Sequence, residues 1–139
     1  MKNLANCTPT EFIKQTVKIK KTVVDWFDKT KILEIRQTQP ALVDFLPNMT
    51  KAEKEEVRTE NVKRQNEQAK KNLLKMFDMA FEEYPEKTLE VLAAVCFTDF
   101  ADVDTHTMSE YFGSLNEMIN DENVIGFFTS LVRLANGNI

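Results

Sequence analysis

The residues of this chain that could do chemistry gather around its single histidine. His106 closely follows Asp99, Asp102 and Asp104, and carboxylate oxygens are the ligands that hard cations prefer. An EF-hand loop that started at Asp102 would need glycine at its sixth position and glutamate at its twelfth. The sequence has a threonine and a glycine there instead. An acidic turn that leads into a helix fits this segment better, so we expect no metal site.

The two cysteines offer little more chemistry. Cys96 lies in an apolar run, where a buried thiol behaves as a small, unreactive hydrophobe, and Cys7 has no base near it in the sequence. The chain contains no phosphate-binding loop, dinucleotide fingerprint, nucleophile elbow or zinc-binding helix motif. We therefore expect no catalytic residue, no cofactor and no enzymatic activity. Two distant cysteines without a pairing pattern also indicate a reducing cytoplasm.

The composition favours a helical fold. Of 139 residues, 42% are hydrophobic and 29% charged, which is enough apolar matter for a core. With only 3 Gly and 4 Pro, the chain lacks the turn residues that a sheet-rich fold requires. We expect an all-α fold, a single compact domain over residues 1–139 with about five to six helices and a long polar helix in the middle.

Local signals mark where helices begin. A threonine stands three residues before a glutamate at 8–11, 50–53 and 107–110, which is the pattern of a capping box. Asp121 can cap a last helix, and Asn136-Gly137 is a suitable stop for it. We also expect a central, strongly apolar helix around residues 89–97, and a helix that Pro40 ends.

The middle of the chain is unusual in its polarity. Residues 39–49 form a proline-bounded connector with four large apolar side chains, which we expect to pack against the core. Residues 51–84 then contain no Gly or Pro, but 51–72 are almost wholly polar. A helix that is polar on all sides is solvent-exposed or marginal, so we expect residues 51–72 to project from the body or to fray.

Charge is unevenly distributed. Residues 1–36 contain 8 Lys/Arg against 4 Asp/Glu, whereas residues 73–139 contain 3 against 12. The acidic half would repel nucleic acid and anionic lipid and would suit a basic partner. No stretch is apolar for long enough to span a bilayer. We expect neither a membrane nor a nucleic acid as partner.

The C-terminal half is rich in methionine and phenylalanine, which are adaptable residues at surfaces that accept varied apolar partners. Adjacent helical positions such as Phe127 and Phe128 point about 100° apart. If one ring meets the core, the other is free to contact a subunit or a client. The predicted partner-binding residues are Phe112, Phe127, Phe128 and Leu131.

Three runs resemble a known group of proteins. Residues 6–12, 88–97 and 124–134 resemble small prophage-encoded proteins of Gram-positive bacteria that are similar to tail assembly chaperones of long-tailed phages. The resemblance implies a helical protein of the bacterial host cytoplasm that binds the tape-measure protein, keeps it soluble and helps to recruit tail-tube subunits. It also implies absence from the finished virion. Many such proteins exist in a short form and in a longer, frameshifted form.

Two other interpretations stay open. The chain could be a structural tail component, such as a completion or connector protein. It could instead be a small helical regulator that binds nucleic acid through residues 14–36, although Asp25 and Asp28 interrupt the lysines there. The oligomeric state is also open, and a homo-oligomer is among the alternatives.

Overall fold

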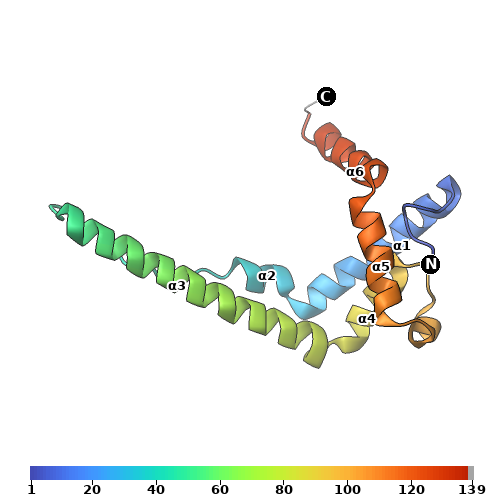
Figure 1. Ribbon diagram of the computed structural model, residues 1–139, viewed down its shortest axis with the longest axis horizontal. Helices are drawn as coiled ribbons and strands as arrows, with labels where there is room; N and C mark the ends of the chain where they lie inside the picture. The colour runs from blue at the N-terminus through green and yellow to red at the C-terminus, as the bar shows by residue number, and fades with distance from the viewer. Residues whose placement is uncertain (138–139) are drawn as a thin grey trace. The chain divides into compact units, whose positions relative to one another are not determined.

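The structure, a computed structural model, describes residues 1–137 and consists of helices and their connections (Figure 1). The α-helices are α1 (Pro9–Thr30), α2 (Ile32–Gln37), α3 (Lys51–Phe77), α4 (Pro85–Val95), α5 (Met108–Asn120) and α6 (Glu122–Ala135). A π-helical segment, η1 (Asp78–Glu83), continues α3, and a 3-10 helix, η2 (Phe100–Thr105), lies between α4 and α5. The described residues contain no strand. The predicted all-α class is confirmed, as is the long helix in the middle of the chain.

The predicted helix starts are also confirmed. At α1, Thr8 Oγ1 accepts from the Glu11 amide at 3.2 Å, and the Glu11 carboxylate accepts from the Thr8 amide at 3.0 Å. Thr107 and Glu110 make the same reciprocal pair at α5. At α3 the threonine half of the box is present, because Thr50 Oγ1 accepts from the amide three residues on at 3.1 Å. Each cap satisfies amide groups that the first helical turn leaves without a partner.

The chain divides into two compact units, one formed by Met1–Trp26 with Glu86–Ile139 and the other by Phe27–Pro85. The first unit has a small core on α4, η2 and α5. Cys96 and Tyr111 are almost fully buried there with Ala93 and Val103. The Tyr111 hydroxyl donates to the Val103 carbonyl at 2.7 Å, so the one polar atom of this ring is satisfied inside the core.

The N-terminal segment belongs to the first unit through a buried asparagine. Asn3 is fully buried, and its side-chain amide donates to Ser114 Oγ on α5 at 3.0 Å. Its side-chain oxygen accepts from the Ala5 amide at 2.7 Å. The polar start of the sequence did not indicate this, because burial of an asparagine depends on partners that are distant in the chain.

Helix α1 is joined to α4 by polar contacts. The Trp26 indole donates to Thr88 Oγ1 at 2.9 Å, and Lys87 forms an ion pair with Asp25 at 2.9 Å. Helix α1 runs without interruption from Pro9 to Thr30. These contacts hold the N-terminal helix beside the core helices of the first unit.

In the second unit, α2 packs against α3 (Figure 1). The connector, residues 39–49, runs alongside α3 in an extended conformation. Asn61 on α3 bonds both backbone groups of one connector residue, because its side chain accepts from the Val43 amide at 2.8 Å and donates to the Val43 carbonyl at 3.1 Å. Arg64 donates to the Ala41 carbonyl at 3.0 Å, and Asn72 donates to the Thr38 carbonyl at 3.0 Å. Polar side chains of α3 therefore satisfy backbone groups of an extended segment.

The expectation that residues 39–49 pack against a core is wrong. Leu42, Phe45 and Leu46 are exposed, and the segment contacts the polar helix α3 instead. The Phe45 ring lies 5.8 Å from the Arg58 guanidinium carbon. Polar side chains on α3 hold the connector by its backbone, which leaves Leu42, Phe45 and Leu46 in solvent.

Candidate protein-binding surface

Helix α6 carries the clearest candidate site of the molecule. Its first turn is capped by Asp121, whose carboxylate accepts from the Asn123 and Val124 amides, both at 3.0 Å. A carboxylate at this position also stabilises the positive end of the helix dipole. The helix ends where Gly137 adopts a left-handed conformation with φ of 72°, as the Asn-Gly stop predicted. Both ends of α6 are thus defined by its own sequence.

One face of α6 is apolar over about half of its circumference. Residues that recur at three- and four-residue spacing share one face of a helix. None of the residues of α6 is buried. Six large apolar side chains have exposed fractions between 37% and 61%: Ile125, Phe127, Phe128, Leu131, Val132 and Leu134.

The six exposed fractions add up to three whole residues, or roughly 450 to 600 Å² when each residue has about 150 to 200 Å² of surface, the lower part of the range for aromatic side chains. The largest apolar patch on an ordinary soluble monomer covers about 300–600 Å². Helix α6 alone therefore reaches the upper end of that range. The largest apolar patch on a monomer is often a functional surface, so the face of α6 is the candidate binding site.

Phe12 of α1 anchors the start of α6. Its ring meets Phe127 edge-on, with 5.3 Å between ring centroids, and stacks on Phe128 at 6.1 Å. The sequence suggested that one of the two adjacent rings would meet the core. Instead both rings contact Phe12, and both stay partly exposed. Such aromatic contacts fix the position of the rings without removing them from solvent.

A groove of about 440 Å³ lies between the N-terminal segment, α1 and α6. Its apolar walls include Leu4, Phe12, Ile13, Val124 and Phe127. The groove is open to solvent and could accept one or two large apolar side chains of a partner. A shallow apolar groove beside an exposed apolar helix is the arrangement that binds amphipathic helices in other proteins.

Helix α5 presents a second, narrower apolar stripe. Met108, Phe112 and Ile119 are exposed and share one face of the helix by their spacing. Of the four predicted partner-binding residues, the structure groups Phe127, Phe128 and Leu131 on α6 and places Phe112 on this separate stripe. Sequence reasoning missed Ile125 and Val132. A helical-wheel projection of residues 122–135 would have found them.

Charges around α5 and α6 are almost all negative. The charged residues of the two helices and their caps are Glu110, Glu117, Asp121, Glu122 and Arg133. Glu110 accepts from the imidazole of His106 at 2.8 Å. This contact, followed by the Thr107 amide, lowers the pKa of Glu110 below its ordinary value, so the acid stays ionised. The rim of the apolar faces is therefore acidic.

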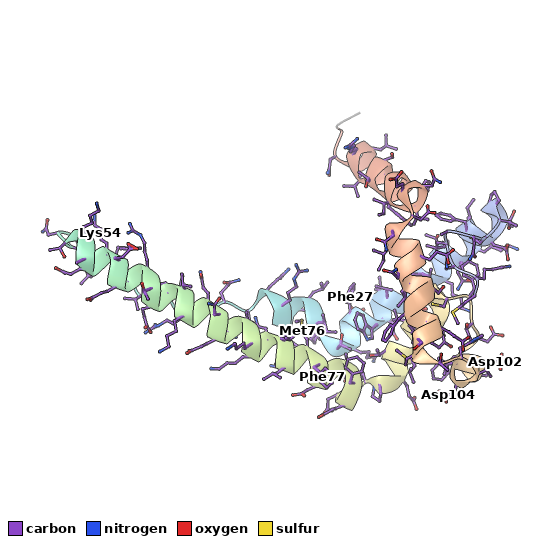
Figure 2. All side chains as sticks on the ribbon, in the orientation of Figure 1. Phe27, Lys54, Met76, Phe77, Asp102 and Asp104 are labelled. Carbon is purple, nitrogen blue, oxygen red and sulfur yellow. The ribbon has the colours of Figure 1, made fainter. Side chains whose placement is uncertain are left out.

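The acidic segment before α5 is a turn. Figure 2 shows Asp102 and Asp104 on η2, and the amide of Asp102 donates to the Asp99 carbonyl at 2.9 Å. Within residues 1–137, no group of three His, Cys, Asp or Glu side chains could hold a metal ion. The segment shortens the path from α4 to α5 and brings Val103 into the core.

The cysteines lie in different surroundings. Cys96 is 1% exposed, and burial raises the pKa of its thiol above the ordinary value, which disfavours the reactive thiolate. Cys7 is half-buried beside the groove. The structure brings no histidine contact to either thiol among its described hydrogen bonds and ion pairs.

The lysines of α1 lie on a helix that is already engaged with α4. Lys14, Lys18 and Lys21 are exposed on α1. Trp26 on the same helix is half-buried, and its indole donates to Thr88 Oγ1. The Trp26 ring is therefore engaged inside the first unit.

No helix in the described part of the chain is both long and apolar enough to cross a membrane. Comparisons with family models, with curated proteins and with solved structures give no match.

Proposed function

We propose that this chain is a tail assembly chaperone-like protein of a long-tailed phage, which binds the tape-measure protein in the bacterial host cytoplasm and assists tail assembly. The resemblance of residues 6–12, 88–97 and 124–134 to such proteins suggests the family. The observation that carries the proposal is the apolar face of α6, which none of the described residues buries. Its mode of action is binding, with no chemical step.

A tape-measure protein is long, helical and apolar along its seams, so its apolar surface must be shielded from water until the tail tube assembles around it. The face of α6 and the adjoining groove can bind an amphipathic helix of this client and bury its apolar side. Burial of the six apolar side chains at about 25 cal/mol per Å² would contribute the main driving force, against which the cost of association stands.

The acidic rim has two uses in this proposal. Glu110, Glu117 and Glu122 keep a complex that contains apolar surface hydrated and mutually repelling, which opposes aggregation. The same charges favour clients whose apolar stripe is flanked by lysine or arginine. Long-range attraction of this kind raises the rate of association more than the final affinity.

The test is co-expression of the chain with the tape-measure-like protein encoded nearby, followed by pull-down and a solubility assay. We expect the client to become soluble and to co-purify. Phe127→Ser, Phe128→Ser, Leu131→Ser and Phe112→Ser should each reduce co-purification, with the largest loss on α6, because buried aromatic anchors dominate binding energy.

Phe100→Ser is the matched control, because Phe100 on η2 is exposed to a similar extent but lies away from the α6 face in the sequence. If the four variants capture the client as well as the wild type does, the binding surface is elsewhere. If the wild-type chain leaves the client insoluble and unbound, a structural tail component becomes the better proposal. Ring formation and recovery from purified virions would support that role.

A further inference from the structure

The segment that runs alongside α3 is as extended as a β-strand. Thr38 bonds to Asn72 of α3, and Val43 bonds to Asn61. From Asn61 to Asn72 the helix rises by about 16 Å, at about 1.5 Å per residue. The shorter run from Thr38 to Val43 covers the same distance at about 3.3 Å per residue, which is the rise of a strand.

Only one edge of this extended segment is satisfied. The Asn61 side chain bonds both the N–H and the C=O of Val43, as a neighbouring strand would, and α3 also donates to the carbonyl of Ala41. In an extended chain the backbone groups of alternate residues point to the same side. Those of Ala41 and Val43 therefore face α3, and those of Leu42 and Asp44 face away from it. None of the residues that the structure describes donates to or accepts from the backbone of Leu42 or Asp44.

We propose that residues 41–45 bind an extended segment of another protein, which adds to this outer edge as an antiparallel β-strand and places a lysine or arginine opposite Asp44. An edge with unpaired N–H and C=O groups is a template for a further strand, and main-chain bonds of this kind are the basis of peptide binding by strand addition. Antiparallel pairing is the more stable of the two orientations per residue. Leu42 and Asp44 would each exchange a pair of backbone hydrogen bonds with the partner.

The side chains on one face of the connector specify the sequence of the partner. Leu42, Asp44 and Leu46 share a face because they alternate along an extended chain, and all three are exposed. Asp44 forms no ion pair within the described part of the chain, whereas Arg58 and Arg64 of α3 both pair with glutamates of their own helix. Apolar pairs and opposite charges across two strands stabilise their pairing. The partner should therefore present apolar, basic and apolar side chains in alternation.

A second copy of the connector is a poorer occupant of this edge. If two connectors pair about Val43, Asp44 of each copy lies opposite Leu42 of the other. If they pair about Asp44, the two carboxylates oppose each other and repel. If they pair about Leu42, Asp44 lies opposite Pro40, which has no N–H to donate. In none of these registers does Asp44 meet a cation.

The strand-addition site is independent of the face of α6. It lies in the second unit and accepts an extended segment, whereas α6 and its groove suit a helix. Its test therefore needs no tape-measure protein, and a negative result there leaves the co-purification test untouched.

The probe is the capped peptide acetyl-Thr-Val-Thr-Lys-Thr-Val-Thr-amide, which reads the same in both directions and lets its lysine face Asp44 while its valines face Leu42 and Leu46. It is titrated into the isotope-labelled full chain, and amide hydrogen exchange is followed by NMR. We expect the Leu42 and Asp44 amides to exchange about tenfold more slowly when about nine-tenths of the sites are filled, because exchange then requires the free form. The Val43 amide, which Asn61 already bonds, should change little.

Two methylated versions of the peptide separate backbone pairing from side-chain contact. N-methyl groups on the valines and the lysine replace the N–H groups that face the connector in an antiparallel pair, so they should abolish the protection. N-methyl groups on the threonines lie on the far edge of the added strand and should leave the protection in place. Equal protection by both versions would overturn strand addition.

Asp44→Lys tests the charge of the partner. It should weaken binding of the lysine peptide about fivefold at low salt, because an opposite-charge pair across the strands becomes a like-charge pair. It should also favour a peptide with glutamate in place of lysine. Asp28→Lys, at an exposed aspartate of the same unit, controls for net charge and should leave both affinities unchanged.

Three further results would overturn the proposal. The first is unchanged exchange of the Leu42 and Asp44 amides at the highest soluble concentration of peptide. The second is equal affinity of the Asp44→Lys variant for the lysine and glutamate peptides. The third is protection of these amides that rises with the concentration of the chain alone, which would assign the edge to a second copy.

Discussion

Helix α3 is polar on nearly every side, yet three of its polar side chains hold a segment of its own chain, whereas α6 has a broad apolar face that its own chain leaves exposed. Asn61, Arg64 and Asn72 on α3 hold the backbone of residues 38–43. On α6, Phe12 contacts the first turns, and Leu131, Val132 and Leu134 remain in solvent.

The difference shows that hydropathy alone does not locate a binding site. By composition, α3 is the helix that would be expected to wait for a partner, and α6 is the helix that would be expected in a core. In the fold, α3 instead supplies hydrogen-bond partners to an extended connector, and α6 stays outside the small core of the first unit, which α4, η2 and α5 fill.

The largest effect should come from truncating a buried residue on the polar helix. Val57 on α3 is 8% exposed, so Val57→Ala should lower the free energy of unfolding by about 2 kcal/mol through lost burial and a small cavity. Leu131→Ala on the apolar helix should cost only about 0.5 kcal/mol at low protein concentration. Urea denaturation measures both, and a larger cost at Leu131 would invalidate the comparison.

The next largest loss of stability should come from breaking the hydrogen bonds between Asn61 on α3 and the connector. Asn61→Ala removes two hydrogen bonds to Val43 and should cost about 1 to 2 kcal/mol, since partly buried bonds each contribute about 1 kcal/mol. Asn66→Ala, an exposed asparagine on the same helix, is the matched control for the change in helix propensity. Equal unfolding midpoints for the two variants would mean that the hydrogen bonds between Asn61 and Val43 contribute nothing to the free energy of unfolding.

A smaller effect should distinguish the helix caps. Asp121→Ala removes a charged cap that accepts two amides at the start of α6 and should cost about 1 kcal/mol. Thr50→Ala at α3 removes one bond from an uncharged side chain and should cost less. Hydrogen exchange of the first-turn amides reports each cap separately. Faster exchange at α3 than at α6 after the respective substitutions would contradict this ranking.

The smallest effect is a pH dependence of stability that arises at the start of α1. This part of α1 forms one wall of the groove beside α6. A hydrogen bond from Lys2, followed by the Thr8 amide, lowers the pKa of Glu11 from 4.5 to about 2. Because the folded pKa is depressed, the stabilisation from ionised Glu11 is fully present above pH 4.5 and is lost as the pH falls toward 2.

The stability difference between wild type and Glu11→Gln should therefore be constant near neutral pH and should shrink between pH 4.5 and 2. Thermal unfolding of both proteins across this range measures it. A difference that stayed constant down to pH 2 would show that the Glu11 carboxylate is not held by Lys2 and Thr8 in solution.

Much of the fold could be predicted because its signals are local. The caps at Thr8, Thr107 and Asp121 bond to amides two or three residues away, so the residues that define a helix start are adjacent in the sequence. The Asn-Gly stop after α6 has the same origin, since glycine adopts the left-handed conformation at little steric cost.

The candidate site could be predicted in part. Phe127, Phe128 and Leu131 were identified from their type and helical spacing, and the structure places them on one exposed face. The role of Phe12 could not be predicted, because its contact with α6 joins the two ends of the sequence. The connector was assigned to the wrong neighbour for a related reason, since four apolar side chains suggested a core while backbone hydrogen bonds decided its place.

The sequence by itself therefore determined the helices, their ends and the acidic, phenylalanine-rich character of the C-terminal half, because these depend on neighbouring residues and on composition. Only the tertiary structure decided which faces are covered. Burial of Asn3, the hydrogen bonds of Asn61 and the exposure of α6 each depend on which distant segments meet. Helical periodicity gives the direction of a side chain, but the free energy of a contact requires the partner that the fold brings to it.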